Sequence, residues 1–195
     1  MKDCIFSAHC TELICDKSCP IYAETSYLLD RNGIDISNPV FQANVESINL
    51  AQSHLEKAKG KHHTVYANQT NKVADLITYC AICNNWRGNQ LHCNVYNLKY
   101  SKYIELLKQS WSYKNGEIPE LDYMKIWTSS CKVLVISSLD YVSFGDFECQ
   151  TLLSILQSRQ VTDKSTVIVS PSLNQLVGKG LFFSKLKSVL GGNEG

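Results

Sequence analysis

The chain has 195 residues, of which 44% are hydrophobic and 19% are charged, and its formal net charge is +1. This composition is that of an ordinary globular protein and excludes a disordered chain. No apolar run approaches the roughly 18–20 residues that a membrane-spanning helix needs, and the first residues lack the apolar core of a signal peptide. We therefore expect a cytoplasmic protein without a membrane contact.

The charge is distributed unevenly along the chain. Residues 1–60 carry five Lys or Arg against eight Asp or Glu, whereas the remainder carries 14 against 10. An acidic front and a mildly basic body suit a protein-binding head and a body that can touch DNA, although charged runs are most often solvated faces.

Four of the nine cysteines are clustered near the N-terminus, and the odd total does not fit a secreted disulfide scaffold. The cluster spans sixteen residues and consists of Cys4, Cys10, Cys15 and Cys19. Four thiolates at this spacing can converge on one tetrahedral Zn²⁺ ion, and His9 can replace one of them. Because Pro20 follows Cys19, the run also resembles the end of an iron–sulfur ligand set, so a [4Fe–4S] cluster is an alternative, and free thiols are another. We expect residues 1–34 to form a cysteine-rich metal-binding segment whose order comes from the metal.

The remaining pattern predicts helices and strands in alternation. A helix over residues 21–31 is stopped by Asn32-Gly33, a linker follows, and a second helix covers residues 41–59. Strands are expected at 63–67, 91–98, 133–136 and 166–169, and helices at 72–86, 101–111, 147–159 and 181–190, with a polar loop at 114–122. This alternation predicts an α/β domain over residues 39–195, built on a parallel sheet with helices on both faces.

Three segments of this domain stand in a characteristic order. They are residues 66–73 (YANQTNKV) before a long helix, 133–140 (VLVISSLD) on a buried strand, and 166–170 (TVIVS) on the next strand. Over roughly residues 39–190 this order resembles the AAA+ ATPase domain of DnaC/DnaI-type bacterial helicase loaders, in which such segments are the P-loop, the Walker B strand and the sensor strand. DnaI-type loaders also carry a cysteine-rich zinc domain that contacts the replicative helicase. The resemblance thus implies a P-loop-like core and a role in DNA replication.

The P-loop position departs from the family pattern. A phosphate-binding loop needs glycines, a lysine and a Ser or Thr hydroxyl for magnesium. Only Lys72 remains, because Tyr66 and Asn71 replace the glycines and Val73 replaces the hydroxyl. Asn71 can still adopt a left-handed conformation, so Lys72 and Asn71 are the residues that would contact a nucleotide.

The Walker B position departs as well. Ser137 and Ser138 replace the paired acids, and Asp140 lies three residues past Ser137, where we expect it not to take over their role. Together these losses predict a pseudo-ATPase that does not use ATP and acts by binding a replicative helicase or another AAA+ subunit. Two alternatives are an atypical ATPase that borrows groups from a partner, and an iron–sulfur or thiol redox sensor.

Two further patterns have a functional and a structural interpretation. Cys80 and Cys83 with the His92-Cys93 pair resemble a second metal site, but core packing is the better interpretation. An aromatic stretch interleaved with lysines can stack on single-stranded DNA, although an amphipathic helix with solvated lysines is favoured. Its aromatic members are Tyr96, Tyr100, Tyr103, Trp111 and Tyr113, and its lysines are Lys99, Lys102, Lys108 and Lys114.

Overall fold

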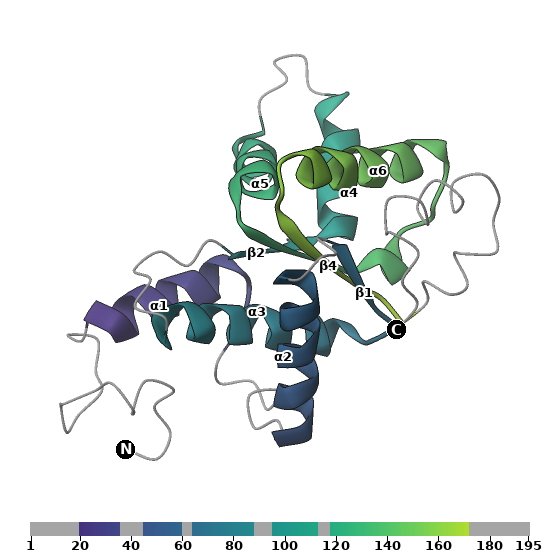
Figure 1. The fold of residues 1–195 in the computed structure, drawn as a ribbon. Helices are drawn as coiled ribbons and strands as arrows, with labels where there is room; N and C mark the ends of the chain where they lie inside the picture. Colours follow the sequence, from purple (N-terminus) through teal and green to yellow (C-terminus); the bar gives the residue numbers. More distant parts are fainter. Residues whose placement is uncertain (1–19, 36–44, 60–63, 88–94, 113–117, 172–195) are drawn as a thin grey trace.

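The computed structural model describes residues 20–35, 45–59, 64–87, 95–112 and 118–171 (Figure 1). Its elements are, in order, α1 (Pro20–Arg31), α2 (Val45–Lys59), β1 (Thr64–Ala67), α3 (Asn71–Arg87), β2 (Val95–Lys99), α4 (Tyr100–Ser110), α5 (Pro119–Ser130), β3 (Val133–Ser137), the 3₁₀ turn η2 (Leu139–Tyr141), α6 (Asp146–Val161) and β4 (Ser165–Val169). Within the described residues the strands form one parallel sheet in the order β1-β4-β3-β2. The prediction of an α/β domain with a parallel sheet is confirmed.

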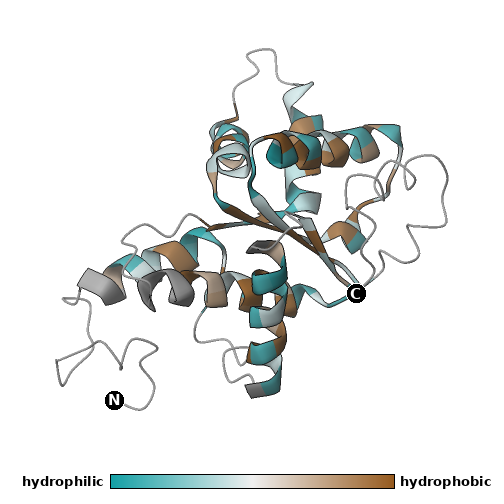
Figure 2. Cartoon of the chain, in the orientation of Figure 1, coloured by the Kyte–Doolittle hydropathy of each residue, from teal (hydrophilic) through white to brown (hydrophobic). Residues whose placement is uncertain are grey.

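The sheet has two apolar faces, and each is covered by its own helices (Figure 1). In β3, Leu134 and Ile136 lie in a first core shared with residues of α4, α5 and α6. Val135, between them, lies in a second core with residues of α2 and α3, as does its partner Val167 of β4. Figure 2 shows hydrophobic residues concentrated along these strands. Strands buried on both faces need such continuous apolar runs, and the expected helices on both faces are present.

Helix α1 ends in a turn that fixes it on this domain. Gly33 has a positive φ of 65°, and its N–H donates to the Asp30 carbonyl at 2.8 Å while the Ile34 N–H donates to the Leu29 carbonyl at 2.9 Å. This pair of bonds is a Schellman C-cap, in which glycine takes the left-handed conformation without strain. Leu29 and Ile34 both lie in the second core. The predicted stop at Asn32-Gly33 therefore also joins α1 to the α/β core.

The C-terminal turn of α1 covers the edge of the sheet at β2. The Asn32 side-chain oxygen accepts a hydrogen bond from the Asn97 N–H at 2.7 Å, and Arg31 Nη2 donates to the Val95 carbonyl at 3.1 Å. An uncovered edge strand presents such groups to other chains. In the part of the chain that the structure describes, the side chains of Arg31 and Asn32 hydrogen-bond to two of these groups.

One helix lies where the sequence predicted a polar loop over residues 114–122. Helix α5 begins at Pro119, where proline is tolerated because the first N–H groups of a helix need no intrahelical partner. Glu120 and Asp122 lie in its first turn and complement the positive end of the helix dipole. The loop prediction was wrong over residues 119–122, because Pro119 starts a helix here, whereas residues 114–117 lie outside the described residues.

Helix α6 runs past its predicted end at residue 159, and Arg159 is buried inside it, only 2% exposed. Arg159 Nε donates to Thr166 Oγ1 at 2.9 Å. The terminal nitrogens donate to four main-chain carbonyls at 2.7–3.2 Å, those of Thr128, Cys131, Lys132 and Ser165. All five guanidinium N–H groups thus have an oxygen acceptor. Arg159 ties the end of α5 to the start of β4.

The four-cysteine cluster before α1 and the helix predicted over residues 181–190 lie outside the described residues. Among the helices that the structure describes, none is long and apolar enough to cross a membrane.

Candidate functional site

The carboxyl edge of the sheet is the place where open parallel α/β sheets bind their ligands. The described strands all end at this edge because they are parallel. Three residues connect the end of β1 to the start of α3. Residues 66–73, which the sequence analysis compared with a P-loop, lie here. The structure brings this segment together with the residues that follow β3 and β4.

The four motif positions are placed differently from those of a phosphate-binding loop. Tyr66 lies inside β1 in register with Ile168, and burial raises its pKa to about 12. Val73 is half-buried and packs against the second core. Lys72 is exposed on the first turn of α3. Two residues, Asn71 and Lys72, were predicted to contact a nucleotide. Of these, Lys72 is the one whose side chain is exposed to solvent.

The connection between β1 and α3 is short and internally bonded. The Gln69 N–H donates to the Ala67 carbonyl, and the Val73 N–H donates to the Thr70 carbonyl, both at 2.9 Å. A phosphate-binding loop needs successive N–H groups that converge on the ligand. Two of those N–H groups are used inside this connection.

Asn68 holds the same connection to the end of β4. With its amide nitrogen oriented toward the carbonyls, Asn68 donates to the Pro171 oxygen at 3.0 Å and to the Ser170 oxygen at 3.3 Å. The Ser170 N–H in turn donates to the Ala67 carbonyl at 3.1 Å. The segment at the P-loop position is thereby bonded to the segment at the sensor position.

Asn71 makes the corresponding link to the end of β3. Its Oδ1 accepts a hydrogen bond from the Ser138 N–H at 2.8 Å, and its Nδ2 lies 3.5 Å from Asp140 Oδ1. Ser138 has a positive φ of 62° and leads into η2, which turns Asp140 back toward the start of α3. Asp140 therefore lies beside the start of α3, and the expectation that it does not take over the role of the acids at the Walker B position stays a prediction.

A buried polar network that the sequence analysis missed lies under this edge. Ser137, at one Walker B acid position, is fully buried and donates to Asn97 Oδ1 at 2.9 Å. Asn97 Nδ2 donates to Asp75 Oδ1 at 2.9 Å, and Lys99 Nζ pairs with the same oxygen at 2.6 Å. These groups satisfy one another, as buried polar groups must. The available signal was a strand that combines apolar residues with Asn97 and Lys99.

The tyrosines proposed for stacking on single-stranded DNA are core residues. Tyr96, Tyr100 and Tyr103 are at most 7% exposed, so their rings cannot accept a base, and the Tyr100 hydroxyl donates to the Glu148 carbonyl at 2.5 Å. Trp111 is 66% exposed, and its ring meets the Phe147 ring edge-on. The favoured interpretation as an amphipathic helix is confirmed for α4, whereas Tyr96 and Lys99 lie in β2, and Tyr113 and Lys114 lie outside the described residues.

The predicted metal ligands Cys4, Cys10, Cys15 and Cys19 lie outside the described residues. Among those described, no group of three or more His, Cys, Asp or Glu side chains could hold a metal ion. Cys80 packs in the second core, as the packing interpretation predicted, whereas the His92-Cys93 pair also lies outside the described residues.

The carboxyl edge is thus a set of loop ends bonded to one another, with Lys72 and Asp140 on its exposed side. The hydrogen bonds between these loops are suited to holding the surface at this edge in one conformation. No protein-family model matches the chain, and neither does any curated protein or any solved structure.

Proposed function

We propose that the protein is a non-catalytic adaptor of the helicase-loader type, which acts in DNA replication by binding a replicative helicase or another AAA+ subunit. The resemblance of residues 66–73, 133–140 and 166–170 to the AAA+ domain of the loaders supports this role.

The observation that carries the proposal is the self-bonded loop at the P-loop position. Backbone N–H groups that would cradle a phosphate donate within the loop, and Asn71 is engaged by Ser138. Binding a phosphate there would break these bonds and move a half-buried Val73. A loop built in this way favours a pseudo-ATPase.

A protein that does not cycle ATP can still act on a partner. It changes the partner's conformational equilibrium if it binds one state more tightly than another. The rigid parallel sheet and its two apolar cores provide a fixed frame for such a binding surface. The metal-stapled segment expected at residues 1–34 is a further candidate contact, with Zn²⁺ as the expected ion and a [4Fe–4S] cluster as the alternative.

One observation favours a second candidate, an atypical ATP-binding AAA+ loader with weak or partner-dependent ATPase activity. Asp140 lies near Asn71 at the start of α3, so a carboxylate is present close to the position where a magnesium ion would be needed. An arginine or further acid supplied by a partner subunit would then complete the site.

The two candidates are separated by measuring phosphate release and helicase binding with the same protein. We expect the 195-residue chain to form a complex with a purified bacterial replicative helicase and to release no phosphate from ATP, with or without DNA. Turnover that is lost in Lys72→Ala and kept in Lys132→Ala, an exposed lysine before β3, would establish the second candidate instead.

A further inference from the structure

Helices α1 and α5 meet in an aromatic cluster centred on Arg31. The Arg31 guanidinium lies 3.9 Å from the centroid of the Trp127 ring and 5.9 Å from that of the Tyr27 ring. Tyr123 extends the cluster, with its ring centroid 6.1 Å from that of Trp127. Arg31 Nη2 also donates to the Val95 carbonyl, so the guanidinium is held between the Trp127 ring and the edge of β2. The cluster is therefore preorganised.

Part of this cluster faces solvent. Tyr27 is 61% exposed, Tyr123 is 39% exposed and Ile126, beside Trp127 on α5, is 62% exposed. Large apolar side chains on a fixed support, with Tyr, Trp and Arg among them, are the composition of protein-binding hot spots.

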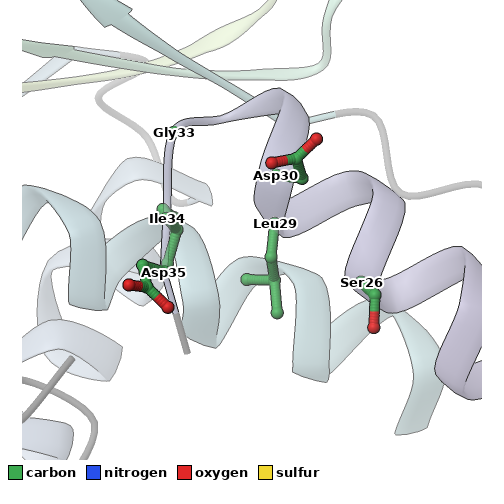
Figure 3. Close-up of a pocket in the computed structure, with 6 residues that line it drawn as sticks. All are labelled: Ser26, Leu29, Asp30, Gly33, Ile34 and Asp35. Atoms are coloured by element: carbon green, nitrogen blue, oxygen red, sulfur yellow. The ribbon is translucent and has the colours of Figure 1, made fainter. Parts of the chain in front are cut away.

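A pocket lies along α1 and the turn that follows it (Figure 3). Its volume is about 280 Å³, and the residues that line it include Leu29, Asp30, Ile34 and Asp35. Asp30 follows Tyr27 by three residues, so the two lie on the same side of the helix. The pocket is small for a cofactor, but its apolar wall and the Asp30 carboxylate suit the aliphatic stem and charged end of a Lys or Arg side chain.

The charge around these features is one-sided. Residues 20–35 and 119–130 contain five acids against two bases, an excess of three negative charges. Both bases are engaged: Arg31 by Trp127, and Lys125 by Asp122 at 3.4 Å. A complementary partner surface is therefore basic.

We propose that the exposed face formed by Tyr27, Asp30, Tyr123 and Ile126, which we name the α1–α5 surface, binds a basic amphipathic segment of a partner protein. Apolar side chains of that segment pack on Tyr27 and Ile126, and one Lys or Arg enters the pocket beside Asp30. This inference deepens the proposed function by naming a binding surface. The choice of a helicase as the natural partner rests on that proposed function.

The first experiment uses a fluorescent amphipathic helical peptide of Leu and Lys, and its Leu/Glu counterpart, titrated against the full-length protein. We expect saturable binding of the Leu/Lys peptide only. Binding should weaken by about tenfold or more in the double variant Tyr27→Ser/Ile126→Ser and in Asp30→Lys. Two matched controls, Val161→Ser at another exposed apolar residue and Glu105→Lys with the same charge change, should bind as the wild type does. Equal binding by all five proteins would overturn the proposal.

The second experiment repeats the comparison with the purified replicative helicase. Loss of helicase binding in the surface variants, with unchanged circular dichroism, would support both proposals. Helicase binding that survives in them would overturn the α1–α5 surface and leave the adaptor function standing. Peptide binding confined to this surface, with no helicase binding by the wild type, would support the surface and refute the adaptor function. Self-association removed by the same substitutions would assign the surface to a second copy and overturn the proposal.

Discussion

Replacement of Arg159 by methionine tests whether this buried arginine stabilises the fold by tying the end of α5 to the start of β4. Methionine keeps most of the length of the side chain and removes its five N–H donors. The Lys132 carbonyl keeps a donor, the Ser165 N–H at 3.0 Å, whereas the remaining acceptors lose the arginine. A lost bond of this kind costs about 1 kcal/mol, partly offset because a buried guanidinium no longer has to be desolvated. We therefore expect a loss of roughly 3 kcal/mol from an unfolding free energy of about 5–15 kcal/mol.

The measurement is urea unfolding followed by far-ultraviolet circular dichroism. Arg159→Lys keeps the positive charge but has fewer N–H donors. Its free energy of unfolding should therefore lie between those of wild type and Arg159→Met. Lys125→Met, at an exposed position of α5, is the matched control and should stay within about 0.5 kcal/mol of wild type. If Arg159→Met unfolds at the wild-type urea concentration with an unchanged slope, the hydrogen bonds contribute no net stability and the reasoning is refuted.

Three further predictions concern acid stability and the N-terminus. Lys108 donates to Glu148 and holds the pKa of this carboxyl below its ordinary value. The stability gained from the pair is present above about pH 4.5 and is lost as the pH falls through the lowered pKa. Acid titration should therefore unfold wild type more steeply than Glu148→Gln, and parallel curves would contradict this. Purified protein should contain about one equivalent of zinc, or a cluster, by elemental analysis, and Cys15→Ser/Cys19→Ser should lose it without unfolding; metal retained in that variant would place the site elsewhere. Deletion of residues 1–19 should leave the melting temperature nearly unchanged, whereas deletion of residues 1–33 should lower it because α1 is part of the second core.

Local sequence patterns predicted the elements whose stability comes from their own apolar residues. The buried strands β3 and β4 are continuous apolar runs, and the end of α1 is marked by Asn32-Gly33. Helix α5 was missed, although Pro119 with two acids in the following turn is a helix-start signal. That signal was outweighed by the polar character of the preceding residues.

The details of the site depend on contacts between residues far apart in the chain. Asn32 and Asn97 are 65 residues apart, and Asn71 and Asp140 are 69 apart. No spacing rule relates such pairs. The return of Asp140 depends on the left-handed conformation of Ser138, a conformation uncommon for residues other than glycine and asparagine. Sequence reasoning located the edge of the sheet correctly but could not predict which side chains close it.

The most direct test of the central claim is a calorimetric titration of the full-length protein with ATP and Mg²⁺. The bonds within the β1–α3 connection and the engagement of Asn71 by Ser138 predict no saturable heat, either for wild type or for Lys72→Ala. Saturable binding by wild type that disappears in Lys72→Ala, while Lys132→Ala still binds, would show that the loop opens to accept a nucleotide and would contradict the account.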